Sequence, residues 1–358
     1  MPRMSIGLVC IVLLSWWVLA ANMVYPSESQ SGSESNLLLL QNDSIVVGIL
    51  PHAGGRIVLL RRPGGENILL SDPDLWKPAD QTPEPSADSN FVKFNGHETW
   101  MGPQQDWWIH QAVNPTRAAS KAVWPPDPWM NLGRFEIVNH QCNSVTLSGP
   151  PSPVSGLQLT KEISIASDGT VSLKTTAKNI RNEPVSWDLW SLTRLPNRSY
   201  VYAPSENESS CRIESAKNDS QQMDVAPHLV RDGVFAFDAN AAFPEGKTDL
   251  VAKAYLNPPI AWMAGFSGGC CIFKKMANSP GEKVHPAQAA IEIYVDITNP
   301  PKSNGMIEME FHSEYRTLLP GEVLTMEESW KVIPYKGPAS VDSHIEFLKT
   351  QGILKTEK

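Results

Sequence analysis

The stretch NDSIVVGILPHAGGRIVLLRRPGGENILL, residues 42–70, contains two apolar runs that are rich in β-branched side chains. The runs are SIVVGIL, residues 44–50, and GRIVLL, residues 55–60, and the turn-forming segment PHAG lies between them. Runs of this length and composition, bounded by glycine and proline, are typical of β-strands. The stretch therefore predicts two consecutive strands joined by a turn.

Period-two alternation continues along the chain. LQLTKEISI, residues 157–165, and TVSLKTTAKN, residues 170–179, are separated by a turn around Asp168-Gly169, a pair with strong hairpin preference. Thirty prolines and 23 glycines punctuate the pattern. Further strands are predicted at residues 185–192, 251–256, 260–264, 270–274, 290–295, 306–312 and 323–333.

One short helix is predicted near the end of the chain. SVDSHIEFLKTQG begins at Ser340, a suitable N-cap, and ends at Gly352, a suitable stop. We therefore expect an all-β protein, one large antiparallel β-sandwich over residues 37–338, followed by a short helix and tail over 339–358. Its long polar or proline-rich loops, residues 71–90 and 116–130, are expected to build a surface feature.

The first residues have the composition of a secretory signal peptide, predicted over residues 1–21. Arg3 precedes an apolar run of about sixteen residues, shorter than the roughly 20 that span a bilayer. Residues 22–36 are predicted to form a flexible leader. We expect a secreted or periplasmic protein without a membrane span after cleavage; the alternative is an uncleaved anchor at residues 6–21.

Charge and cysteine content narrow the possible partners. The formal net charge is −8 and clusters of lysine and arginine are absent from the sequence, so nucleic acid is not an expected partner. Four cysteines follow the apolar run, and we expect at most one disulfide among them, with buried free thiols as the alternative. They are Cys142, Cys211, Cys270 and Cys271.

Several motifs resemble those of the galactose mutarotase-like (aldose 1-epimerase-like) superfamily, and they follow one another in the order expected for that superfamily. The resemblance is closest to a branch known mainly as a domain of unknown function. It begins with the opening hairpin at residues 42–70, and the motifs cover most of the chain after the leader. The later ones are GHETW (96–100), KNIRNEP (178–184), GCCIFKK (269–275) and MIEMEFHSEYRTLLPGE (306–322).

The resemblance implies a large β-supersandwich whose concave face binds carbohydrate. In the family's mutarotases a histidine protonates the sugar ring oxygen and a glutamate takes the anomeric hydroxyl proton, without a metal or an organic cofactor. The family histidine lies about six residues past the proline of an Asn-x-x-x-x-Pro turn. Here that position is Trp190, six residues after Pro184. An indole NH has no useful acidity, so mutarotase catalysis is in question.

The strand MIEMEFH places polar side chains on one face. Alternation puts Glu308, Glu310 and His312 opposite the apolar residues between them. Glu310 then occupies the region of the family's base, and we take it as a candidate catalytic residue with Glu308 as a candidate sugar contact. The alternative is a solvated outer face.

Two basic residues are candidate sugar contacts. Arg56 follows two glycines in a turn, and its planar guanidinium could reach sugar hydroxyls. Hydrogen bonds to loop carbonyls are the alternative role for Arg56. Lys274 ends a predicted strand and could point inward, although lysines at strand ends are commonly solvated.

The stretch FNGHETWMGPQQDWW, residues 94–108, combines tryptophans with a histidine in a segment interrupted by glycine and proline. Tryptophan rings stack on sugar faces, so Trp100, Trp107 and Trp190 are candidate contacts. Core packing is the alternative role for about half of the rings. His97 is a second candidate acid, because a loop would free it from strand alternation.

The sequence thus favours an exported carbohydrate-binding protein, expected to be a monomer. One alternative is a cofactor-independent aldose epimerase, or another sugar-processing enzyme, that uses a relocated acid such as His97. The other is a structural module of a cell-surface complex, which predicts a concave face plugged by side chains. GFSGG, residues 265–269, resembles a GxSxG elbow only loosely, because it lies between predicted strands rather than before a helix. The sequence contains no HExxH motif or phosphate-binding glycine loop.

Overall fold

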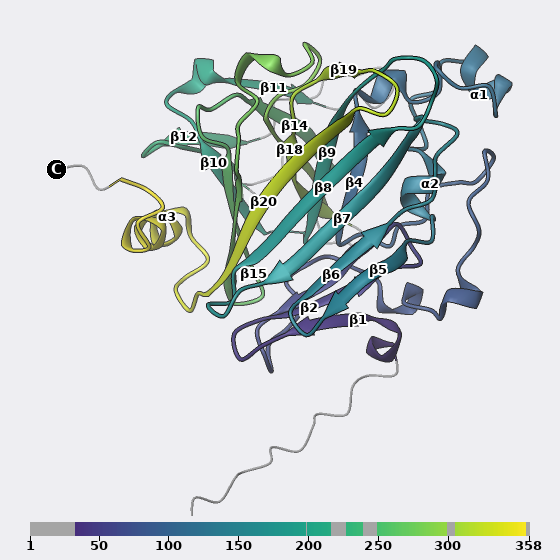
Figure 1. Cartoon of the computed structure of the whole chain (residues 1–358). Helices are drawn as coiled ribbons and strands as arrows, with labels where there is room; N and C mark the ends of the chain where they lie inside the picture. Colours follow the sequence, from purple (N-terminus) through teal and green to yellow (C-terminus); the bar gives the residue numbers. More distant parts are fainter. Residues whose placement is uncertain (1–32, 198, 216–226, 239–248, 299–304, 356–358) are drawn as a thin grey trace, which may run out of the picture.

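The computed structural model describes residues 33–197, 199–215, 227–238, 249–298 and 305–355. In this part of the chain, two ten-stranded antiparallel sheets pack against each other (Figure 1). Apolar side chains from both sheets form one large buried core between them. The predicted antiparallel β-sandwich is confirmed.

The first sheet contains both strands of the opening hairpin and the predicted strand MIEMEFH. β19 (Arg316–Leu318) pairs with β9 beside the main path. The other strands, in spatial order, are β1 (Leu38–Gln41), β2 (Val46–Leu50), β3 (Arg56–Arg61), β4 (His97–Gly102), β9 (Val185–Pro196), β18 (Met306–His312), β17 (Ile291–Thr298), β14 (Asp249–Leu256) and β11 (Cys211–Ser215).

The second sheet contains the hairpin around Asp168-Gly169. Its strands, in spatial order, are β12 (His228–Arg231), β13 (Val234–Phe237), β10 (Tyr200–Pro204), β15 (Trp262–Ser267), β16 (Cys270–Met276), β20 (Val323–Pro334), β8 (Val171–Asn179), β7 (Leu157–Ile165), β6 (Ser144–Ser148) and β5 (Glu136–Gln141).

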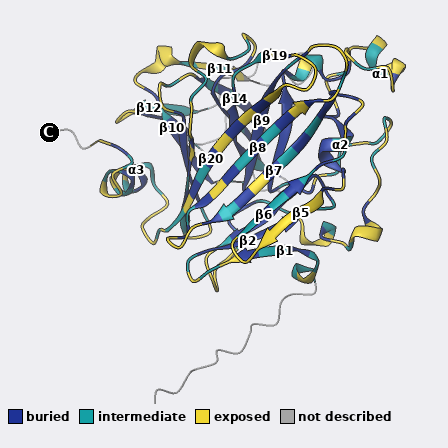
Figure 2. Cartoon of the chain, in the orientation of Figure 1, coloured by how far each residue is buried: buried dark blue, intermediate teal, exposed yellow. Residues whose placement is uncertain are grey.

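Burial follows the period-two pattern of the sequence. In β7 and β8 every second side chain is buried in the core, and the residues between them lie on the outer face. Figure 2 shows the same alternation as bands of colour along β7, β8 and β20. One apolar and one polar face per strand is the pattern of an antiparallel sheet with a solvated side.

The expectation of a loop around His97 is wrong. His97–Gly102 form β4, and all six residues are buried. β4 pairs with β9 along its length, with Trp100 opposite Trp190. Gly96, with φ +71, provides the bend before the strand, and a Cβ there would lie 2.2 Å from the Ile57 carbonyl oxygen. Strand alternation therefore applies to His97 after all.

Helices are short in the described chain. The short 3-10 turns are η1 (Glu34–Asn36), η2 (Pro73–Leu75), η3 (Ala79–Gln81), η4 (Gln104–Asp106), η5 (Glu208–Ser210) and η6 (Gly281–Lys283). Two short helices, α1 (Pro115–Ala119) and α2 (Pro128–Asn131), lie in the long connection that follows β4. The predicted C-terminal helix is confirmed as α3 (Val341–Thr350), which packs Ile345 and Leu348 on the outer face of the second sheet.

Cys142, Cys211, Cys270 and Cys271 are free, in keeping with the alternative of free thiols. Within the described residues, no helix has the length and apolar character needed to cross a membrane. The predicted signal peptide and alternative anchor lie outside these residues, as does most of the predicted leader.

Candidate functional site

Four indole rings gather over the first sheet and are called here the tryptophan cluster: Trp100, Trp107, Trp124 and Trp190. The Trp100 ring centroid lies 5.2 Å from that of Trp190, 5.4 Å from Trp107 and 6.0 Å from Trp124. Trp124 is 50% exposed, whereas the other three rings are buried. Edge-to-face contacts at these distances fix the rings as one rigid group.

Two tryptophans that follow β4, Trp107 and Trp108, have their NH groups satisfied within the chain. Trp107 donates to the Met101 carbonyl oxygen at 2.6 Å, and Trp108 donates to the Pro125 carbonyl oxygen at 2.7 Å. These bonds hold the connection between β4 and α2 over the sheet. Trp100 and Trp107, both predicted sugar contacts, are therefore buried supports of this connection.

The alternation predicted for β18 is confirmed. Ile307, Met309 and Phe311 belong to the core between the sheets. On the opposite face, Glu310 accepts a hydrogen bond from Trp190 Nε1 at 2.6 Å, and His312 is the register partner of Trp190. Glu310 and Trp190, both predicted site residues, are thus in direct contact.

A buried charge network lies beside the tryptophan cluster. Glu98 pairs with Arg194 and with Arg56, whose Nη2 lies 3.1 Å from Glu98 Oε2. Arg194 also donates to Glu308 at 2.6 Å. Burial raises the pKa of Glu98, but the two guanidinium groups outweigh it, so the pKa lies below its ordinary value.

Arg56 does not point toward a ligand site. Its guanidinium donates to the carbonyl oxygens of Ala53 at 2.7 Å and Asn131 at 2.9 Å, and its side chain is fully buried. Arg56 therefore has the alternative role that the sequence left open, hydrogen bonds to loop carbonyls. Glu308, held by Arg194, is likewise part of the charge network.

His97 and Lys274 lie between the two sheets, on the far side of the first sheet from the tryptophan cluster. Both residues contact the hydroxyl of Thr193. His97 Nδ1 lies 2.9 Å from Thr193 Oγ1, and Lys274 Nζ lies 2.6 Å from the same atom. Lys274 also lies 3.1 Å from Glu328. Burial, reinforced by Lys274, holds the pKa of His97 well below its ordinary value. The structure therefore places both residues in the core, away from any sugar.

A second charged group lies below Trp190 and is called here the polar centre: Asp188, Lys253, Glu292, Glu310 and His312. Lys253 Nζ lies 2.5 Å from Glu292 Oε2 and 2.9 Å from Glu310 Oε2. His312 Nδ1 lies 2.9 Å from Asp188 Oδ1, and His312 Nε2 lies 3.5 Å from Glu292 Oε1. Lys253 also lies 4.6 Å from the Trp190 ring centroid.

These contacts shift the pKa values of the centre. Burial raises the pKa of Glu310 to about 7, against the opposing effect of Lys253. Burial opposes ionisation of Glu292 too, but Lys253 and His312 lower the pKa of that carboxyl to about 2. For His312 the Glu292 and Asp188 carboxylates outweigh burial and raise the pKa to about 10. Opposite charges thus alternate through the centre.

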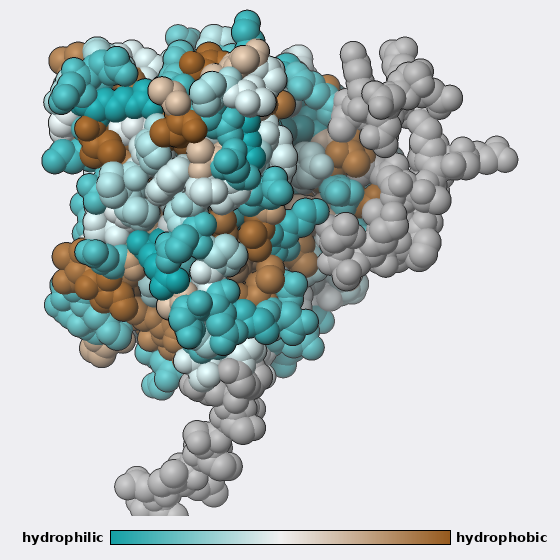
Figure 3. All heavy atoms as spheres, turned by 90° about the vertical axis from the view of Figure 1, so that its right-hand side faces the viewer, coloured by the Kyte–Doolittle hydropathy of each residue, from teal (hydrophilic) through white to brown (hydrophobic). Residues whose placement is uncertain are grey.

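A cavity of about 260 Å³ opens above the polar centre and is called here the Trp190 pocket. Glu310 and His312, both fully buried, lie beneath its floor. Figure 3 views the side of the molecule on which α1 and α2 lie, and shows apolar side chains in separate groups among hydrophilic ones. The lining residues are Pro103, Gln104, Gln105, Val123, Trp190, Lys253, Tyr255, Ala287, Gln288 and Glu292.

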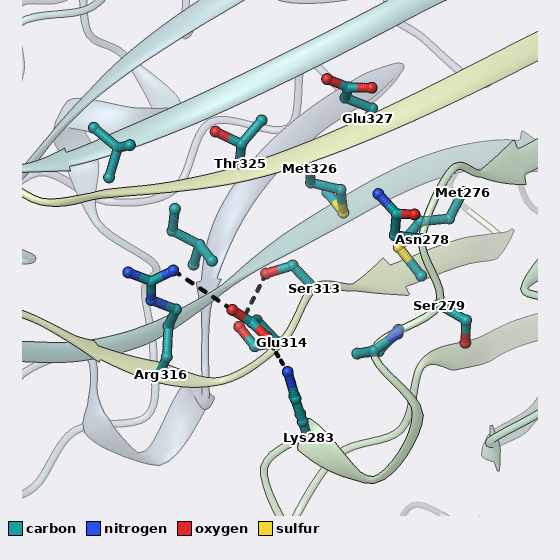
Figure 4. Close-up of a pocket in the computed structure, with 13 residues that line it drawn as sticks. Met276, Asn278, Ser279, Lys283, Ser313, Glu314, Arg316, Thr325, Met326 and Glu327 are labelled. Carbon is teal, nitrogen blue, oxygen red and sulfur yellow. Dashed lines mark hydrogen bonds and ion pairs between the residues drawn. The ribbon is translucent and has the colours of Figure 1, made fainter.

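A larger cavity, of about 510 Å³, lies between the segment after β16, the end of β18 and the start of β20 (Figure 4). Lys283 and Arg316 both point toward Glu314, with N–O distances of 3.2 and 3.5 Å. These charges satisfy one another at the surface. The Trp190 pocket is smaller, but it combines an aromatic ring with polar groups held in place by buried partners, so we take it as the candidate site.

Sequence reasoning missed Lys253, Glu292, Asp188 and Tyr255. A signal was present, because Lys253 and Glu292 interrupt otherwise apolar strands, VAKAYL and IEIYV. A charged residue inside an apolar strand is rarely buried without a partner. The pairing of β14, β17 and β18, which brings these side chains together, was not visible in the sequence.

The fold and the family are both recognisable by comparison. A family model described as "Domain of unknown function (DUF4380)" matches residues 36–333. A candidate aldose 1-epimerase from Escherichia coli K12 superposes with a TM-score of 0.53 at 14% identity, covering 83% of this chain and 99% of that one. A galactose mutarotase-like protein from Lactobacillus casei gives 0.51 at 12% identity, with coverages of 83% and 99%. Comparison with curated proteins gave no match.

Proposed function

We propose that this chain, which belongs to the DUF4380 family and has the galactose mutarotase-like fold, binds a carbohydrate in the Trp190 pocket. One observation carries the proposal. The pocket places the Trp190 ring next to Lys253, Tyr255 and Glu292 on a concave part of the first sheet. An aromatic face beside a few fixed polar groups is the usual composition of a sugar site.

The size of the pocket supports a small ligand. Its volume of about 260 Å³ lies near the lower end of the roughly 300–1,000 Å³ of typical ligand pockets. We propose that it holds one sugar unit, either a monosaccharide or the end of an oligosaccharide. Lys253 would donate to sugar oxygens, and Glu292 would accept from hydroxyls.

Binding without ring opening is the version that the geometry supports best. The resemblance implies an acid where this chain has Trp190, whose indole NH donates to Glu310, and His97 lies on the core face of the first sheet. Glu310 accepts from both Trp190 and Lys253 beneath the pocket floor. An acid and a base on opposite sides of a sugar are therefore not presented by this arrangement.

The open pocket argues against a purely structural module, for which the concave face would be filled by side chains.

Export is a separate proposal, which depends on the signal-like composition of residues 1–21. Expression of the full chain with a secretion-competent host, followed by amino-terminal sequencing, tests it. A mature protein that starts near residue 22 is expected, and an intact amino terminus would contradict export by cleavage.

Titration calorimetry against a panel of mono- and oligosaccharides tests the binding proposal. We expect saturable binding at millimolar or lower concentration, and its loss in a Trp190→Ala variant. Trp262→Ala, in β15 of the second sheet, is the matched control and should bind as the parent does. The proposal would be overturned if the parent protein bound none of the saccharides, or if Trp190→Ala bound them as tightly as the parent does.

Polarimetry separates binding from epimerase activity. Freshly dissolved glucose and galactose should mutarotate at the buffer rate in the presence of the protein. An acceleration that disappears in Glu310→Gln would instead favour the epimerase alternative.

A further inference from the structure

Three potential metal ligands meet beneath the floor of the Trp190 pocket. Glu292, Glu310 and His312 each offer one ligand atom, and these atoms lie within 4.8 Å of one another. The sheet brings them together, because Glu292 and Glu310 are register partners on β17 and β18 while His312 follows Glu310 on the same face. Carboxylates directly opposite each other on neighbouring strands repel, and here Lys253 Nζ offsets the repulsion through one oxygen of each.

Two of these ligand atoms lack a hydrogen-bond partner among the described residues. They are Glu310 Oε1 and His312 Nε2, and both side chains are fully buried. Glu292 Oε1 lies 3.5 Å from His312 Nε2. Buried polar atoms in folded proteins are nearly always satisfied, so Glu310 Oε1, which has no hydrogen-bond partner, and His312 Nε2, which has only the long ion-pair contact to Glu292, together indicate a missing group. Carboxylate oxygens and an imidazole nitrogen together suit a cation.

The histidine has the support that metal-binding histidines have in proteins. Its Nδ1 lies 2.9 Å from Asp188 Oδ1. A carboxylate that accepts from one ring nitrogen fixes the tautomer and leaves the other nitrogen free to bind a metal. Asp188 would therefore serve as the outer partner of the site.

Lys253 already neutralises part of the negative charge, but through different atoms. Its Nζ contacts Oε2 of Glu292 and Oε2 of Glu310. The Oε1 atom of Glu292 faces His312, and the Oε1 atom of Glu310 is unpartnered. An ion could thus bind to the Oε1 atoms and the imidazole with Lys253 in place, although the ammonium group would weaken it.

We propose that Glu292, Glu310 and His312 bind a first-row divalent metal ion, with Zn²⁺ as the representative, and that Asp188 orients His312. One imidazole and two carboxylates are ligands that such ions accept. The ion competes with Lys253 and with a proton on His312 Nε2, because a ligating nitrogen must be deprotonated. The site does not depend on sugar binding.

The test uses the purified full chain, stripped with a chelator and titrated with Zn²⁺ by calorimetry and with Co²⁺ by visible absorption, without sugar. One ion per chain is expected. His312→Ala and Glu310→Gln should each lower the affinity at least tenfold, and Asp188→Asn should lower it by about 10- to 100-fold. His140→Ala, an exposed histidine on β5, is the matched control and should leave the affinity unchanged.

Lys253→Met keeps the proposal testable if the ligand variants fold poorly. Removal of the competing ammonium group should raise the affinity several-fold, whereas a site unrelated to Lys253 would not respond. Absence of stoichiometric Zn²⁺ binding in both the parent and Lys253→Met, or equal affinity in folded His312→Ala, would overturn the proposal. Since no sugar is present, its failure leaves the carbohydrate proposal untouched.

Discussion

At the scale of single residues, the proposed carbohydrate binding depends most on the indole of Trp190. Trp190 Nε1 donates to Glu310, and the ring forms part of the pocket wall. An indole can donate a hydrogen bond and stack on a sugar, but it cannot give up a proton near neutral pH. In the proposed site, Trp190 would therefore contribute recognition and not acid catalysis.

His97 provides a residue-scale prediction, because its environment differs from that of a surface histidine. Its pKa lies well below the ordinary value of 6.5, because of burial and the nearby Lys274. In NMR spectra, assigned with a His97→Gln variant, its ring signals should show no titration between about pH 6 and 7. A midpoint in that range would mean that His97 is accessible to solvent.

The lowered pKa of His97 also makes the stability of the protein depend on pH. Only the unfolded chain binds a proton at His97 near pH 6, so this residue makes the free energy of unfolding fall as the pH drops below about 6.5. His97→Gln should flatten that part of the stability curve, measured by urea unfolding at several pH values. An unchanged slope would contradict a buried neutral His97.

At the scale of elements, β4 shows why the site is rigid. Its residues are buried on both faces, one face in the core and the other under the connection that contains α1 and α2. Glu98 links β4 to β3 through Arg56 and to β9 through Arg194. Buried charges of this kind hold the strands in one register, because each depends on its partners.

Neutralising Glu98 should therefore destabilise the whole first sheet. Glu98→Gln leaves two buried guanidinium groups with less compensation, and we expect a loss of about 3–5 kcal/mol in the free energy of unfolding. Urea unfolding at neutral pH measures it. The exposed Glu162→Gln, on β7, is the control and should change stability by less than about 0.5 kcal/mol.

The Glu98 effect should also depend on pH. Because the folded-state pKa of Glu98 is lowered, its stabilisation is present above the unfolded-state value of 4.5 and is lost as the pH falls through the folded-state value. The difference between the parent and Glu98→Gln should shrink in acid. A difference that grows in acid would contradict the ion-pair assignment.

The C-terminal helix gives a second element-scale prediction. Leu348 is fully buried where α3 packs on the second sheet. Leu348→Ala should lower the free energy of unfolding by about 2–5 kcal/mol through the cavity that it leaves. Glu346→Ala, exposed on the same helix, is the control. Equal stability of the two variants would show that α3 does not dock as described.

At the scale of the whole molecule, the candidate site is assembled from distant parts of the sequence. β9, β14, β17 and β18 supply the polar centre, and the segment around Gln104 and Val123 supplies the opposite wall. Trp124, half exposed, follows Val123 at the pocket. Under the proposed carbohydrate binding, Trp124 would provide a second stacking surface for a ligand longer than one sugar unit.

Ligand length should therefore reveal the role of Trp124. Trp124→Ala should weaken binding of an oligosaccharide by about three- to tenfold, the equivalent of roughly 0.5–1.5 kcal/mol, and leave its monosaccharide unit unaffected. Calorimetry with matched ligands of increasing length measures the difference. An equal loss of affinity for both ligands would instead place Trp124 beside the sugar unit in the Trp190 pocket.

Local pattern determined much of the architecture. Alternation in β7, β8 and β18, the Asp168-Gly169 turn and the Ser340 cap each depend on a few consecutive residues, and the structure confirms them. The family motifs gave the fold. The contact between Trp190 and Glu310 was not predicted, because it depends on the pairing of β9 with β18.

Alternation assigns a side chain to one of two faces, but it does not say which face meets the second sheet and which meets the pocket. The sequence therefore did not show that His97 and Lys274 lie on the core face. It also did not show that Arg56 binds loop carbonyl oxygens. Lys253 and Glu292 became part of the site only because β14, β17 and β18 are neighbours in the sheet. The sequence by itself determined the fold and the strands with clear alternation, but not strands such as β4; the pairing of strands far apart in the chain decided which charges meet, since contact between them requires long-range packing.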